Sequence, residues 1–249
     1  MLAEERFAAI LSLLKEKKTV TVLELTQALQ ISESTIRRDL IALHKMGKLK
    51  KVHGGATLLH KDYGLYETGM VERSKAHLDE KKKIAEYAAS LIQAHDFIYL
   101  DSGSTTLQMV EYLDEKDAIY VTNGLEHAKR LANLGFRVFI LAGEIKDATE
   151  AVVGLGAVSS LQKYNFTKSF LGTNGITVDS GFTTPDVNEA YVKSEVMKHS
   201  QRTYVLADSS KFGTCTSISV ADISDAAIIT TEGVDAEYSE EAEIIEVKA

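Results

Sequence analysis

A run of small polar residues at positions 101–106 could hold a phosphate group. It reads Asp-Ser-Gly-Ser-Thr-Thr and follows the apolar run Phe97–Leu100, where a helix is expected to begin. Backbone N–H groups at a helix start, together with hydroxyls, can surround an anion, and the helix dipole favours negative charge there. The run is not a Walker loop, because no Gly-Lys-Ser/Thr follows it. The candidate phosphate ligands are Asp101, Ser102, Gly103, Ser104, Thr105 and Thr106.

Other short polar residues follow four further apolar runs. We add them to the candidate ligand-binding set: Thr122, Asn123, Gly143, Gly172, Asn174, Asp208 and Lys211. The lysine could neutralise a phosphate or lie near a sugar carbonyl. Each loop alone also fits a simpler role, since Asp208 could cap a helix and Lys211 could be an ordinary surface lysine. Their recurrence at several strand ends favours a shared binding edge.

The second half of the chain alternates apolar runs with amphipathic segments. The expected strands lie at 97–100, 118–121, 137–141, 169–171, 203–207 and 226–229, with helices near 79–92, 155–163 and 189–200. Repeated strand–loop–helix units predict a mostly parallel α/β sheet covered on both faces. Ligands bind beyond the carboxyl ends of strands in such sheets, so the candidate residues are expected at one edge.

The first 58 residues predict a winged helix-turn-helix. Helices are expected at 4–17, 23–29 and 33–46, and Ser32 can cap the third by accepting a backbone N–H bond. Ile36, Leu40 and Leu43 give this helix a buried face, while its opposite face is basic. Two short strands at 48–52 and 56–59, joined by His53-Gly54-Gly55, would form the wing.

A basic helix after a short turn suits insertion into the major groove of double-stranded DNA. The candidate DNA-binding residues are Ser32, Ser34, Thr35, Arg37, Arg38, Lys48, Lys51 and His53. Arg37 and Arg38 are the candidates for guanine edges, because a guanidinium matches O6 and N7. We expect Asp39 to orient an arginine. The alternative is a three-helix domain with a solvated charged face.

Charge is distributed unevenly along the 249 residues. The chain carries a net charge of −8, but residues 1–58 carry +4 and the remainder −12. A basic module attached to an acidic body fits a nucleic-acid partner for the module alone. We therefore expect a DNA-binding domain at 1–58, a linker at 59–74 and a ligand-sensing domain at 75–249.

The composition also excludes several kinds of site. The single cysteine, Cys215, leaves no internal disulfide and no cysteine zinc site, and the histidines lack metal-ligand spacing. No apolar run is long enough to span a bilayer, and the start lacks a secretion signal. We expect a cytoplasmic protein with no metal, no cofactor and no membrane partner.

Several motifs resemble the DeoR family of transcriptional repressors. They include Ser32-x2-Thr35-Ile36-Arg37-Arg38-Asp39-Leu40, Val52-His53-Gly54-Gly55-Ala56, Asp101-x-Gly103-x-Thr105-Thr106 and Asp208-x2-Lys211-Phe212. The resemblance implies a sensor domain with a ribose-5-phosphate-isomerase-like fold, operator binding by a dimer or tetramer, and a sugar phosphate effector. Residues 170–175, 181–186 and 189–190 most resemble the fructose operon repressors of the family, which implies fructose 1-phosphate as the effector.

Two other functions fit parts of the same pattern. A sugar-phosphate isomerase with an appended DNA-binding module would need a general base, and Asp101, or Asp208 with Lys211, could serve. We prefer a sensor with no catalytic residue, because no carboxylate pair stands out. The sequence does not distinguish a repressor from an activator.

Overall fold

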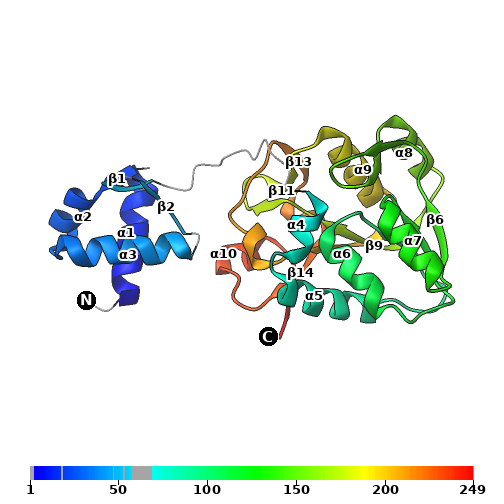
Figure 1. The fold of residues 1–249 in the computed structure, drawn as a ribbon, viewed down its shortest axis with the longest axis horizontal. Helices are drawn as coiled ribbons and strands as arrows, with labels where there is room; N and C mark the ends of the chain where they lie inside the picture. Colours follow the sequence, from blue (N-terminus) through cyan, green and yellow to red (C-terminus); the bar gives the residue numbers. More distant parts are fainter. Residues whose placement is uncertain (1–2, 18, 47, 53, 58–68, 249) are drawn as a thin grey trace. The chain divides into compact units, whose positions relative to one another are not determined.

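The chain divides into two compact units, residues 1–62 and 63–249. The computed structural model describes residues 3–17, 19–46, 48–52, 54–57 and 69–248 (Figure 1). His53 of the predicted wing turn and residues 58–59 of its predicted second strand lie outside the described residues.

The first unit is a three-helix domain with a small sheet. Its elements are α1 (Ala3–Lys17), β1 (Thr19–Thr21), α2 (Val22–Leu29), α3 (Glu33–Lys45), β2 (Lys50–Val52) and β3 (Gly55–Thr57). The three predicted helices are confirmed, and Ile36, Leu40 and Leu43 of α3 are buried in the core as expected. The two strands of the wing are also present, as β2 and β3.

The wing contains one strand that the sequence pattern did not predict. Residues 19–21, which interrupt the helical pattern, form β1 and pair with β3, giving the order β1-β3-β2. This pairing explains Gly55, where a Cβ atom would lie 2.2 Å from the carbonyl oxygen of Val20. The hairpin is thereby joined to the helical core rather than projecting from it alone.

The turn between α2 and α3 is short and capped on both sides. Gln30 ends α2 in the left-handed conformation at φ 54°, and its N–H donates to the carbonyl of Thr26. The hydroxyl of Ser32 accepts from the backbone N–H of Thr35 at 3.4 Å, as the sequence predicted. These caps set the direction in which α3 leaves the turn.

The second unit is built around a parallel sheet of seven strands. Their order is β15-β14-β12-β9-β4-β5-β6, and every pairing in this sheet is parallel. The strands are β4 (Phe97–Leu100), β5 (Ile119–Thr122), β6 (Arg137–Ile140), β9 (Phe166–Gly172), β12 (Ser200–Leu206), β14 (Ala227–Thr231) and β15 (Ile244–Val247). The predicted α/β fold is confirmed, and β15 is an additional strand.

Helices cover both faces of this sheet (Figure 1). The helices are α4 (Met70–Lys75), α5 (Leu78–Ser90), α6 (Ser104–Met109), α7 (Leu125–Asn133), α8 (Leu155–Leu161), α9 (Val187–Lys198) and α10 (Ala236–Glu241). Side chains of α5, α6 and α7 share one buried apolar cluster with the sheet, and those of α8, α9 and α10 share the other. Each face therefore has its own core.

Two smaller sheets were not predicted from the sequence. One contains β10 (Gly175–Thr177), β11 (Gly181–Thr184) and β13 (Ile218–Ala221), and the other pairs β7 (Glu144–Lys146) with β8 (Ala151–Val153). These strands have three or four residues each, which is too short to show a period. Likewise, residues 70–75, mostly within the expected linker, form helix α4.

Candidate functional site

The predicted DNA-binding residues that the structure describes lie at the start of α3, on its open face, and in the segment 48–52 that contains β2. Most of them are exposed: Ser32, Ser34, Arg37, Arg38, Lys48 and Lys51. Thr35 is half-buried, and the hydroxyls of Ser34 and Thr35 lie 3.1 and 3.0 Å from that of Ser32. Arg37 is paired with Glu33 one turn earlier, at 3.1 Å. Because this pair is exposed to solvent and therefore weak, both Arg37 and Arg38 stay candidates for a base contact.

The arginine that Asp39 orients is Arg6 of α1. It is neither Arg37 nor Arg38 of the same helix. Two hydrogen bonds of 2.7 and 3.0 Å join the Arg6 guanidinium to the Asp39 carboxylate, whose side chain is only 7% exposed. The hydrogen bond to Asp39 raises the pKa of Arg6. This bidentate pair fixes α3 against α1, so the exposed face of α3 is held in one orientation.

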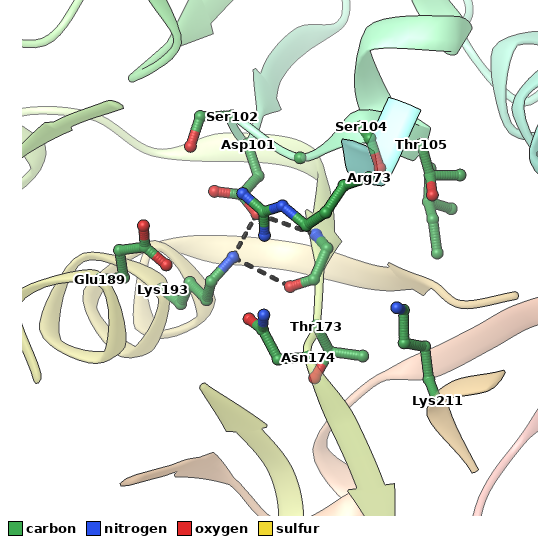
Figure 2. Close-up of a pocket in the computed structure, with 13 residues that line it drawn as sticks. Arg73, Asp101, Ser102, Ser104, Thr105, Thr173, Asn174, Glu189, Lys193 and Lys211 are labelled. Carbon is green, nitrogen blue, oxygen red and sulfur yellow. Dashed lines mark hydrogen bonds and ion pairs between the residues drawn. The ribbon is translucent and has the colours of Figure 1, made fainter. Parts of the chain in front are cut away.

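A polar pocket of about 490 Å³, open to solvent, lies at the carboxyl edge of the parallel sheet. Eight of the predicted ligand-binding residues line it: Asp101, Ser102, Gly103, Ser104, Thr105, Gly172, Asn174 and Lys211. It also contains five residues that the sequence analysis did not select: Arg73, Thr173, Glu189, Lys193 and Leu206. Figure 2 shows side chains from α4, α9 and three strand ends converging on one space.

A buried ion pair forms one wall of the pocket. The Lys193 ammonium on α9 contacts Asp101 Oδ2 and donates to the carbonyl of Gly172 at 2.9 Å. The same carboxylate oxygen accepts from the backbone N–H of Gly172 at 2.9 Å. The Asp101 side chain is 2% exposed and that of Lys193 is 9% exposed. The two charges are therefore compensated within the fold, and together they join β4, β9 and α9 (Figure 2).

Glu189 is held at the pocket by three donors. Its Oε1 accepts from Lys146 at 3.0 Å and from Thr149 at 3.1 Å, and its Oε2 accepts from Thr184 at 3.3 Å. Asp186 caps α9 by accepting the backbone N–H of Glu189 at 2.9 Å. These contacts fix the Glu189 carboxylate in the wall of the pocket, where Lys146 is shared with Asp186 at 3.2 Å.

Buried side chains support the 101–106 loop from behind. Thr106 points into the protein, where its hydroxyl donates to the carbonyl of Asp101 at 2.6 Å and lies 3.1 Å from Nε2 of His127. Burial lowers the pKa of His127 to about 4, so the imidazole is neutral at pH 7. A Cβ atom at position 124 would lie 2.4 Å from His127 Nδ1, which requires glycine there. This packing fixes the loop that lines the pocket.

Five of the predicted ligand-binding residues do not line the pocket: Thr106, Thr122, Asn123, Gly143 and Asp208. Thr122 and Asn123 are buried, because the β7–β8 hairpin covers their strand end and Val152 N–H donates to the carbonyl of Asn123 at 2.6 Å. A Cβ atom at Gly143 would lie 2.5 Å from the carbonyl of Val153. Asp208 caps the 3₁₀ turn Ser209–Lys211.

Arg73 and Lys211 bring positive charge to the side of the pocket lined by hydroxyls. Lys211 lies 3.8 Å from the buried Asp208 Oδ2, and Arg73 reaches the pocket from α4 (Figure 2). The arrangement can accommodate a small polar anion, with hydroxyls and amides for directional bonds and cations for charge. Among the described residues, no group of three or more histidines, cysteines, aspartates or glutamates could hold a metal ion.

Removing one partner of the buried pair tests its structural role. We expect Lys193→Met to lower the free energy of unfolding by about 3–5 kcal/mol, because Asp101 keeps a buried uncompensated charge. Urea denaturation followed by circular dichroism measures this loss. The matched control is Lys198→Met on the same helix, whose side chain is 70% exposed; it should change stability by less than about 0.5 kcal/mol. Equal effects of the two variants would contradict the assignment.

The buried imidazole predicts a pH dependence of stability. Between pH 6.5 and 4 the unfolded state binds a proton at His127 that the folded state does not, so stability falls as the pH falls. This group alone should account for roughly 3 kcal/mol across that interval. We expect His127→Gln to show a shallower pH dependence than the original chain in urea denaturation. An unchanged slope would show that His127 does not titrate as described.

Both units match descriptions of known domains. Residues 6–62 match the DeoR-like helix-turn-helix domain, and residues 76–233 match the DeoR C terminal sensor domain. No helix among the described residues combines the length and apolar character needed to cross a membrane.

Two transcriptional regulators resemble the chain over nearly its whole length. The protein named "Uncharacterized HTH-type transcriptional regulator FruR", from Bacillus subtilis (strain 168), is 45% identical, with 93% of this chain and 92% of that protein covered. A "Lactose phosphotransferase system repressor" from Staphylococcus epidermidis is 32% identical, with 96% of each chain covered. A solved ribose 5-phosphate isomerase A from Methanocaldococcus jannaschii is 16% identical and covers 55% of each chain at a TM-score of 0.40. The chain belongs to the DeoR family of transcriptional regulators.

Proposed function

We propose that this chain is a repressor that leaves its operator DNA when a phosphorylated sugar, fructose 1-phosphate, binds the pocket. The observation that carries the proposal is the pocket itself. It combines hydroxyls of the 101–105 loop with the cations Arg73 and Lys211, in the sensor unit of a chain whose other unit is a helix-turn-helix. Hydroxyls and cations together suit a phosphate ester better than a neutral sugar.

The sugar and the direction of regulation have separate support. The fructose assignment depends on the resemblance of residues 170–175, 181–186 and 189–190 to the fructose operon repressors of the family. The repressor assignment is supported by the name of the staphylococcal relative. We propose that the protein acts in the cytoplasm as a homodimer or tetramer on repeated half-sites, and that it needs no metal or cofactor.

The pocket favours binding over isomerase chemistry. Asp101 is engaged by Lys193 and the Gly172 amide, and Asp208 is fully buried at a helical cap. A general base must reach a substrate proton, but the Asp101 oxygen Oδ2 is held in an ion pair and Asp208 does not line the pocket. A coupled assay on ribose 5-phosphate and fructose phosphates tests this, and turnover abolished by Lys211→Ala would support an enzyme instead.

Ligand-dependent release from DNA is the central expectation. Operator fragments can be selected from genomic DNA with the full-length protein, and binding can be followed by fluorescence anisotropy. Fructose 1-phosphate should weaken operator binding about 5–150-fold, which corresponds to a coupling of about 1–3 kcal/mol. Fructose, which lacks the phosphate, is the control. Unchanged affinity with fructose 1-phosphate, fructose 6-phosphate and fructose 1,6-bisphosphate would exclude the proposal.

An exposed arginine of α3 provides a test of the DNA interface. We expect Arg38→Ala to weaken operator binding by about 1–3 kcal/mol, because a guanidinium that reads a guanine is lost. Arg38→Lys keeps the charge but not the two-pronged geometry, so it should recover little of the specific affinity. An equal loss of affinity for random DNA would make Arg38 a phosphate contact and contradict its base-reading role.

A further inference from the structure

Helix α4 links the pocket to the part of the chain that leads to the helix-turn-helix. It begins at Met70, shortly after the segment 58–68 that connects the two units in sequence. Arg73 lies in the middle of this short helix and reaches the pocket beside Asp101 and Lys193 (Figure 2). A ligand that contacts Arg73 therefore contacts the first described helix of the sensor unit.

A buried lysine anchors α4 to α5. The Lys81 ammonium donates to the backbone carbonyl of Arg73, and the Lys81 side chain is only 3% exposed. Burial lowers the pKa of Lys81, so keeping its charge there is unfavourable unless a nearby group compensates it. The bond is made to the backbone of Arg73, whose side chain lines the pocket.

The compensating group is Asp208, which Lys81 shares with a cation of the pocket. Asp208 Oδ2 lies 3.8 Å from the ammonium of Lys81 and 3.8 Å from that of Lys211. This oxygen is buried and has no hydrogen-bond partner among the described residues. The Ser210 amide and hydroxyl both donate to the other carboxylate oxygen, Oδ1. One carboxylate oxygen therefore divides its attraction between the anchor of α4 and a residue that lines the pocket.

We propose that the half-buried Lys211 and the buried Asp208 and Lys81 form a relay through which an anionic ligand in the pocket controls how firmly α4 is held. This inference rests on the proposed function, since it takes the phosphorylated ligand as its input. A phosphate draws Lys211 toward itself and away from Asp208. The Asp208 charge then acts mainly on Lys81, which is bonded to the Arg73 carbonyl of α4. The ligand also acts on α4 directly, through the Arg73 side chain that lines the pocket.

Hydrogen exchange on the full-length protein, combined with operator binding, tests the relay. In the unmodified chain, fructose 1-phosphate should slow amide exchange both at residues 101–106 and at residues 69–76. Lys81→Met should retain the slowing at 101–106, because Lys81 does not line the pocket. It should lose most of the ligand-dependent change at 69–76, and the ligand should weaken operator binding by no more than about twofold.

Two further variants make the test specific. Lys83→Met removes an exposed lysine from the same helix and should behave like the unmodified chain. Lys81→Gln keeps a donor for the Arg73 carbonyl but not the charge. Amide exchange at 69–76 should therefore stay slow in this variant and should not change when the ligand is added. Lys81→Gln also replaces Lys81→Met if that variant does not fold.

The outcomes separate the relay from the proposed function. If the ligand changes neither exchange nor operator binding in the unmodified chain, the proposed function fails and the relay with it. If the unmodified chain responds and both Lys81 variants respond like Lys83→Met, the relay is wrong and the proposed function stands. Slowing at 101–106 without any change at 69–76 in the unmodified chain also overturns the relay.

Discussion

The contact of Lys193 with Asp101 and Gly172 holds together three of the segments that line the pocket. Asp101 directly follows β4, Gly172 ends β9, and Lys193 lies on α9. A buried carboxylate is stable only if charge and hydrogen bonds compensate it. That requirement fixes the start of the 101–106 loop, and with it the direction in which the loop presents its hydroxyls.

In each unit a buried carboxylate is paired with a cation from another element. Asp39 with Arg6, and Asp101 with Lys193, are paired within the protein and set the orientation of an element. Other charged residues, such as the exposed Arg38 and the pocket-lining Lys211, face solvent or the pocket. The buried pairs cannot be replaced by surface charges, since their effect depends on exclusion from water.

The connection between the units gives the small helix α4 a particular importance. The chain enters the sensor unit there, and α4 contributes Arg73 to the same pocket as the ends of β4 and β9. Regulation requires that ligand binding and DNA binding share a structural element with more than one stable arrangement. Helix α4 is held by a buried lysine that shares a carboxylate with the pocket, and the relay proposed above assigns it this role.

The sequence by itself determined the helix-turn-helix, the parallel sheet, the Ser32 cap and the 101–105 loop, because period, caps and strand ends are local properties. The tertiary structure alone decided that Arg73, Glu189 and Lys193 enter the pocket, and that Arg6 is the partner of Asp39. It also removed Thr122 and Asn123 from the pocket, since the β7–β8 hairpin covers their strand end. Contacts between segments distant in sequence depend on how helices and hairpins pack over the sheet, and no local pattern records that packing.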